Sequence, residues 1–213
     1  MTVASLPSPA GPQHVVLDDV SWESYENLLN EIGDRPVFVS FCRGSLEIMP
    51  PLPEHELEKK ALGSLLELVA LETKMPMRRF GSTTFRSKDD QVGLEPDECY
   101  YIRNEARVRK MRRFDPKVYP PPDLSIEIEI TRRSVPRQPI YAALGVPELW
   151  RYDGARLTVL ILSQGTYVPT QVSPTFPFLP LDGLVAYVAR MLGDEEQNAV
   201  IEEFRAWVRQ LPK

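Results

Sequence analysis

Hydrophobic and polar residues follow two different periods along the chain, and these periods separate predicted helices from predicted strands. Apolar side chains recur at helical spacing over residues 22–32, 54–72, 139–144, 181–192 and 195–211. Runs rich in β-branched and aromatic residues predict strands over 37–42, 46–49, 77–80, 83–87, 96–102, 123–131, 149–152, 157–162 and 166–169. Helices before, between and after the strands predict a single α/β domain.

Turn residues divide these elements. Arg43-Gly44 and Asp153-Gly154 each join two strand-like runs, which indicates two hairpins. Residues 1–13 are rich in Pro, Ser and Gly, and we expect them to be a loose lead-in.

Composition agrees with one globular domain spanning 1–213. A chain of 213 residues can bury enough apolar surface to fold without disulfides. The two cysteines, Cys42 and Cys99, are expected to be reduced core thiols. The N-terminus has neither the basic nor the apolar region of a signal peptide, and no apolar run could span a membrane. We therefore expect a cytoplasmic protein.

The segment 122–131 carries the clearest chemical signal. Because side chains alternate in a strand, Asp123, Ser125, Glu127 and Glu129 share one face, and apolar residues fill the other. An exposed strand with a solvated polar face is the plain alternative. Three carboxylates on one face with no lysine among them repel one another unless a cation intervenes. Oxygen ligands of this kind suit Mg²⁺ or Mn²⁺.

A second acidic strand lies upstream at 94–102. Taken alone, Pro96-Asp97 is a turn dipeptide at the start of a strand. Taken with Glu127, it suggests that two adjacent strands share one Mg²⁺, which would activate a water and stabilise charge on a phosphodiester.

Several motifs in order resemble the Uma-type family of bacterial endonucleases, in the PD-(D/E)XK restriction-endonuclease-like superfamily. They are Glu-Pro-Asp97, Pro-Pro-Asp-Leu-Ser-Ile-Glu127 and the segment from Tyr141 to Asp153. The resemblance covers about residues 22–204. It implies a mixed sheet flanked by helices, with an N-terminal helix and hairpin and two C-terminal helices, a Mg²⁺ site and phosphodiester cleavage.

The resemblance also implies roles for individual residues. Asp97 and Glu127 would bind the metal, and Glu129 takes the place that is often lysine in the superfamily. Arg137 stands where the family usually has a lysine, four positions before Tyr141; it stays protonated, so it would stabilise charge or hold a phosphate. Which group activates the water is left open.

Three further residues have competing interpretations. Asp123 matches an aspartate of the family and could contact the metal or cap the turn into its strand. His55 could be a proton donor or a neighbour of the metal site, although a capping or packing role is favoured. Glu56 could assist metal binding, although a first-turn carboxylate stabilised by the helix dipole is favoured.

Charge is distributed unevenly. The net charge is −5, but residues 78–137 contain 14 Lys and Arg against 10 Asp and Glu, so this stretch carries +4 and the remainder −9. A solvated loop is the usual role of such a run. Here it flanks the expected metal site, so we predict phosphate contacts from Arg109, Lys110, Arg112 and Arg113.

These observations support a Mg²⁺-dependent endonuclease acting on DNA, with RNA not excluded and homodimerisation expected by analogy. The rival hypothesis is a catalytically degenerate module that binds nucleic acid or protein, favoured by Glu129 and Arg137 in place of lysine. A hydrolase for a small phosphorylated substrate is a third hypothesis.

Overall fold

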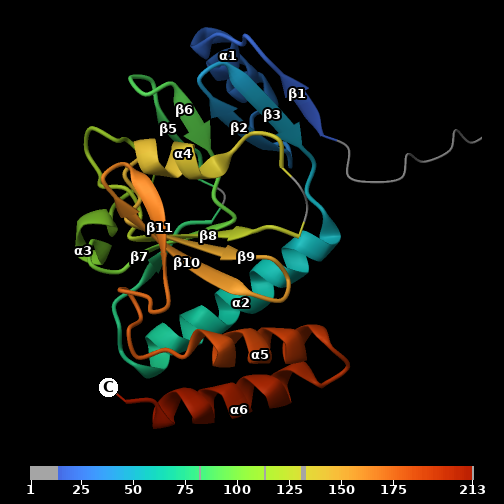
Figure 1. The fold of residues 1–213 in the computed structure, drawn as a ribbon, viewed down its shortest axis with the longest axis vertical. Coiled ribbons are helices and arrows are strands. Elements are labelled where there is room, and N and C mark those ends of the chain that lie inside the picture. Colours follow the sequence, from blue (N-terminus) through green and yellow to red (C-terminus); the bar gives the residue numbers. More distant parts are fainter. Residues whose placement is uncertain (1–13, 82, 113, 131–132, 213) are drawn as a thin grey trace, which may run out of the picture.

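The computed structural model describes residues 14–81, 83–112, 114–130 and 133–212, and it confirms the α/β class (Figure 1). The helices are α1 (Trp22–Ile32), α2 (Pro53–Glu72), α3 (Glu105–Val108), α4 (Arg137–Ala143), α5 (Leu181–Leu192) and α6 (Gln197–Gln210). The strands are β1 (Val15–Leu17), β2 (Phe38–Cys42), β3 (Ser45–Met49), β4 (Arg78–Arg79), β5 (Phe85–Ser87), β6 (Val92–Leu94), β7 (Glu98–Tyr101), β8 (Leu124–Ile128), β9 (Glu148–Tyr152), β10 (Leu157–Ser163) and β11 (Thr166–Thr170).

The strands form two sheets. The N-terminal sheet has the order β1-β3-β2-β6-β5 and is antiparallel. The central sheet has the order β11-β10-β9-β8-β7-β4, and its β8–β9 pair is parallel, which makes it mixed as expected. Helix α4 contacts β2 and β6 of the first sheet and β11 of the second, so it lies at their junction (Figure 1).

Local sequence explains the N-terminal elements. Ser21 caps α1 by accepting a hydrogen bond from the Ser24 amide at 3.1 Å. Arg43 and Gly44 have φ of 49° and 97°, the left-handed backbone that a two-residue hairpin turn requires. The predicted β2–β3 hairpin is therefore confirmed, with Cys42 opposite Ser45.

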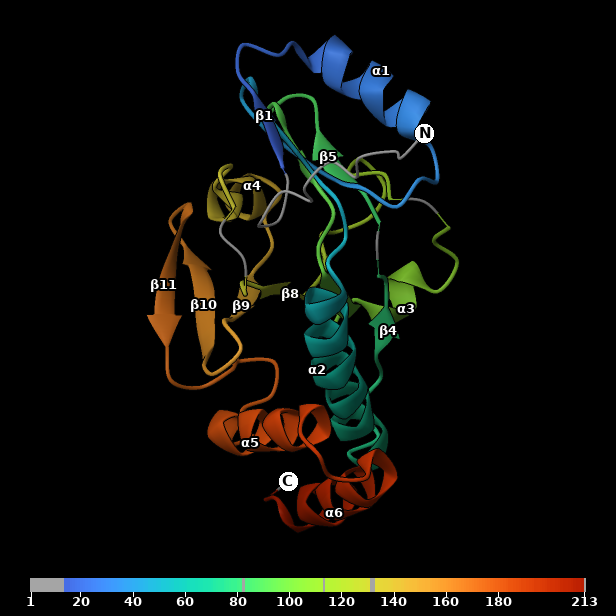
Figure 2. The ribbon, with the colours of Figure 1, turned by 90° about the vertical axis from the view of Figure 1, so that its right-hand side faces the viewer.

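Helix α2 runs across the central sheet and also packs against α5 and α6 (Figure 2). Its buried face includes Ala61, Leu65 and Val69, as the periodicity predicts. Leu57, expected on this stripe, is 59% exposed. In the first turn of α2 the buried residue is His55. Leu57 is two positions further on, so it is rotated by about 200° around the helix and faces away from the core.

The elements that the sequence did not predict are short. Strands β1 and β6 have three residues each and α3 has four, too few for a hydrophobic period to be recognised. Strand β7 begins at Glu98, one residue after Asp97. Within the described part of the chain, every helix is too short or too polar to cross a membrane.

Close packing between α1 and β6 depends on a glycine. A Cβ placed on Gly93 would meet the hydroxyl of Tyr25 and lie 2.8 Å from its Cζ. Tyr25 is fully buried and its ring stacks on Phe41 with centroids 4.7 Å apart, so it has little freedom to move.

We predict that Gly93→Ala lowers the free energy of unfolding by about 2 kcal/mol or more, because overpacking a filled core forces its neighbours apart. Urea denaturation would measure the loss. Gly81→Ala is the matched control, since nothing lies within 4 Å of the added Cβ. An equal effect of the two substitutions would contradict the packing explanation.

Candidate active site

Asp97 lies at the start of β7 and is fully buried. Its Oδ2 accepts hydrogen bonds from His55 Nε2 at 3.0 Å and from the Ile128 amide at 2.8 Å. Its Oδ1 lies 3.2 Å from a terminal nitrogen of Arg133. Three separate segments therefore hold this carboxylate: the first turn of α2, the end of β8 and the segment that follows β8.

Glu127 is the neighbour of Asp97 on the adjacent strand. Strands β7 and β8 are antiparallel with Glu98 opposite Ile126, so the register brings Asp97 beside Glu127. Glu127 is 1% exposed. Its Oε1 accepts a hydrogen bond from Tyr141, and its Oε2 forms an ion pair with Arg137 Nε at 2.9 Å.

One guanidinium nitrogen lies between the two carboxylates. The same nitrogen of Arg133 that contacts Asp97 is 3.9 Å from Glu127 Oε2. Among the described residues, that Oε2 accepts no hydrogen bond of good geometry. Two carboxylates from adjacent strands thus converge on one cation, the side chain of Arg133, where the sequence predicted Mg²⁺.

The two carboxylates differ in their affinity for protons. Burial alone raises the pKa of Asp97, but the hydrogen bond from His55 and the charge of Arg133 outweigh it, so the pKa falls below its usual range. Burial raises the pKa of Glu127 above its usual range, and the charge of Arg137 offsets this only in part. Burial alone would lower the pKa of Arg137, but the negative charge of Glu127 outweighs this effect and raises it. Arg137 therefore stays protonated.

Arg133 and Tyr141 are the site residues that the sequence reasoning missed. Tyr141 stands in the sequence as one member of a family motif, and Arg133 as one of the basic residues of 78–137. The available signal for Arg133 was its position directly after the acidic strand. His55 was expected to cap or pack, but it is buried and bonded to Asp97, so its role as a neighbour of the site is the one supported here.

Glu129 and Arg137 line a cleft of about 610 Å³ that opens over Glu127. Glu129 is paired through both oxygens with Arg151, at 2.6 Å for Nε to Oε1. Arg133 also lines this cleft. Three arginines and two glutamates therefore surround one opening, which suits an anionic group such as a phosphate.

Asp123 has the contacts of a capping residue. Its Oδ2 accepts from the amides of Ile102 and Asn104 at 2.7 and 3.0 Å, and its Oδ1 accepts from the Asn104 side chain at 2.7 Å. These bonds fix the turn after β7 against the start of β8. Asp123 therefore has the capping role that the sequence offered as the alternative to a metal contact.

The four residues predicted to contact phosphate lie in the sequence between the strands that carry Asp97 and Glu127. Arg109 is paired with Glu105 one turn away at 2.8 Å, and Lys110 is exposed. Arg112 is exposed and lines a second, larger cleft. Arg113 lies outside the described residues. Glu56 bonds Lys59 at 3.2 Å and is 3.7 Å from His55 Nδ1.

Asp97 and Glu127 supply carboxylate oxygens, the type of ligand that Mg²⁺ prefers. The described residues contain no group of three His, Cys, Asp or Glu that could hold a metal. Mg²⁺ does not need one, because it keeps several waters and binds through one or two carboxylates together with substrate phosphates. The observation that supports the fit is the buried Oε2 of Glu127, which lacks a hydrogen bond from the described residues and faces a shared cation.

Comparison with known proteins agrees with the motifs. The model of the Uma2 family, described as "Putative restriction endonuclease", matches residues 22–189. A solved structure titled a "putative nuclease belonging to DUF820 from Anabaena variabilis ATCC 29413" is similar at 14% identity and a TM-score of 0.46, over 80% of this chain and 90% of that one. No curated protein sequence matches this chain. Because the family model spans most of its length, this chain belongs to the Uma2 family.

Proposed function

We propose that this chain is a metal-dependent endonuclease that hydrolyses phosphodiester bonds of DNA. The observation that carries the proposal is the convergence of the Asp97 and Glu127 carboxylates on one cationic nitrogen, at 3.2 and 3.9 Å. Membership of a family described as "Putative restriction endonuclease" supports the same reaction class. Homodimerisation stays a prediction by analogy.

Asp97 and Glu127 would hold Mg²⁺ in this proposal. When bound, the ion would supply an activated water and stabilise negative charge on the phosphodiester. Arg133 binds the same two carboxylates, so it competes with the ion and must release them when the ion binds.

The other polar groups of the cleft have distinct roles. Arg137 stays protonated, so it stabilises charge that develops on the phosphate and cannot take a proton from water. Glu129, on the same cleft and 31% exposed, is the carboxylate that accepts this proton, and Arg151 holds it in position. His55 orients Asp97 through its hydrogen bond and is a positioning residue.

A non-catalytic nucleic-acid-binding module is the second candidate. The observation that favours it is that both buried carboxylates are already neutralised by arginines, as in a structural ion-pair network. The two candidates differ in whether the carboxylates bind a metal.

We predict that Mg²⁺ and Mn²⁺ bind to the protein and that Asp97→Asn and Glu127→Gln each weaken binding at least about tenfold, since each substitution removes a ligand charge. Arg133→Ala is expected to tighten binding, because it removes the competing cation. Isothermal titration calorimetry would measure the affinities.

Glu203→Gln, on the exposed face of α6, is the control and should leave metal affinity unchanged. Thermal melting without metal would confirm that each variant is folded. Absence of metal binding in both the unsubstituted protein and Arg133→Ala would support the binding module and exclude the proposed metal site.

We also predict nicking of supercoiled plasmid DNA in Mg²⁺ or Mn²⁺ but not in EDTA. Asp97→Asn should reduce the rate at least about a hundredfold, and Arg137→Lys about tenfold or more, because lysine lacks the planar fork of the guanidinium. Gel electrophoresis would follow the nicked product.

A single-stranded RNA substrate in parallel would test the preference for DNA. If the protein binds metal but leaves DNA intact while it cleaves RNA, the substrate assignment would be wrong and the reaction class would stand. Cleavage that survives Asp97→Asn would point to a contaminating nuclease.

A further inference from the structure

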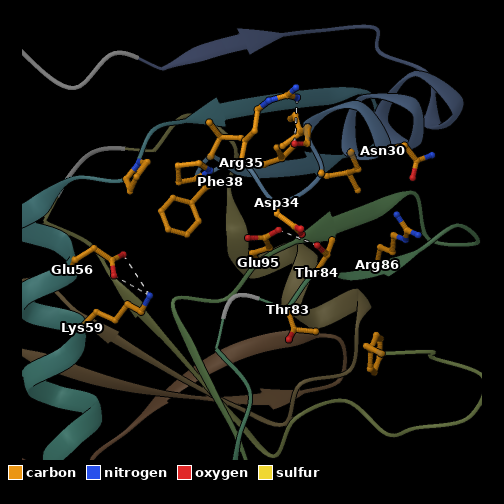
Figure 3. Close-up of a pocket in the computed structure, with 18 of the residues that line it drawn as sticks. Asn30, Asp34, Arg35, Phe38, Glu56, Lys59, Thr83, Thr84, Arg86 and Glu95 are labelled. Carbon is orange, nitrogen blue, oxygen red and sulfur yellow. Dashed lines mark hydrogen bonds and ion pairs between the residues drawn. The ribbon is translucent and has the colours of Figure 1, made fainter. Parts of the chain in front are cut away.

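A second, larger cleft lies beside the candidate active site. Its volume is about 810 Å³, within the range of small-molecule sites in proteins. Figure 3 shows its walls: the end of α1 and the segment after it, β2, the start of α2, and the segments beside β5 and β6. Neither the family description nor the nuclease site accounts for it.

The centre of the cleft presents hydrogen-bond acceptors. The side chains of Asp34, Thr84 and Glu95 point into the cavity (Figure 3). Glu95 Oε1 accepts a hydrogen bond from Thr84 at 2.9 Å, which fixes the direction of this carboxylate.

The periphery carries the opposite charge. Arg35, Lys59, Arg86 and Arg112 line the cleft around Asp34 and Glu95. Lys59 is paired with Glu56 at 3.2 Å and Arg86 with Glu26 at 3.7 Å. Aromatic surface is supplied by Phe38 and Phe114. Phe114 is held in place by Phe85, with ring centroids 4.5 Å apart.

Two contacts connect this cleft to the nuclease site. The backbone carbonyl of Glu95 accepts a hydrogen bond from Arg137, which also pairs with Glu127. Glu56 precedes Lys59 by one turn of α2 and is next to His55, which bonds Asp97. A molecule in the cleft would therefore lie against residues that adjoin both metal-binding carboxylates.

This lining selects one class of ligand. A bare phosphate backbone would be repelled by carboxylates at the centre, and an apolar ligand would leave them without partners. A nucleotide satisfies both regions: amino groups on the base donate to carboxylates, the ring contacts aromatic side chains, and the phosphate meets the peripheral cations. Cytosine has an exocyclic amino group that donates hydrogen bonds to carboxylates, whereas thymine has a carbonyl oxygen in its place, which can only accept.

We infer that this cleft is a base-recognition subsite, which binds a nucleotide with an amino-bearing base next to the cleavage site. The inference rests on the proposed nuclease function for its biological substrate, but nucleotide binding can be measured without cleavage. Asp34 and Glu95 read the base, and a cation of the periphery holds the adjoining phosphate.

The test is a titration of dCMP and of dTMP into the ¹⁵N-labelled full chain, in EDTA, followed by amide chemical shifts. We expect dCMP to shift the amides of Asp34, Thr84 and Glu95 and to bind about tenfold more tightly than dTMP, the lower end of the range for a good base-edge contact. Equal affinity for the two nucleotides, or shifts confined to other residues, would overturn the inference.

Glu95→Gln keeps the shape of the side chain and a partner for Thr84, and it should weaken dCMP binding about tenfold. Glu195→Gln, on the exposed loop between α5 and α6, is the matched control with no effect expected. If Glu95→Gln melts early, Asp34→Asn replaces it with the same expected loss, and unchanged dCMP affinity in the folded variant overturns the inference.

The plasmid assay separates the two proposals. Preferential dCMP binding without any nicking would reject the nuclease and retain the subsite. Nicking together with equal binding of dCMP and dTMP would reject the subsite and retain the nuclease.

Discussion

The structure depends on the neutralisation of two buried carboxylates. Asp97 and Glu127 lie side by side in a region nearly closed to water, where isolated negative charges cost several kcal/mol each. Arg133 and Arg137 supply the opposite charges, and His55 adds a hydrogen bond. Helix α2, the paired strands β7 and β8, the segment after β8 and helix α4 must therefore come together for these two carboxylates to be neutralised. The same requirement concentrates charge where a nuclease would need it.

The N-terminal sheet takes part in this arrangement. Glu47 of β3 is 1% exposed and accepts a hydrogen bond from the Ser134 amide at 2.8 Å. Ser134 follows Arg133 directly, so the hairpin that begins the fold also holds the segment that delivers the central guanidinium. Helix α4, which contacts both sheets, holds Arg137 in the same way. The division into two sheets thus serves the site: the carboxylates come from the central sheet, and elements anchored to the N-terminal sheet bring the cations.

This geometry changes the meaning of the overall charge. A net charge of −5 by itself disfavours a polyanionic partner. Several acids of the +4 central stretch are internally paired, namely Asp97, Glu127 and Glu129. The same ion pairs neutralise Arg133, Arg137 and Arg151, so exposed cations such as Lys110 and Arg112 are the charges that a nucleic acid would meet. The two clefts meet through Arg137 and Glu95, which makes recognition beside cleavage physically reasonable.

The sequence by itself determined the α/β class, the hairpin at Arg43-Gly44 and the long helix over most of its length, and its motifs singled out Asp97 and Glu127. Each is written in local periodicity, turn chemistry or ordered motifs, which need no tertiary information. Only the tertiary structure decided that Asp123 binds backbone amides, that His55 faces Asp97, and that Arg133 lies between the two carboxylates. These contacts join segments tens of residues apart. Their geometry is set by the pairing of β7 with β8 and the packing of α2 on the sheet, which no local pattern encodes.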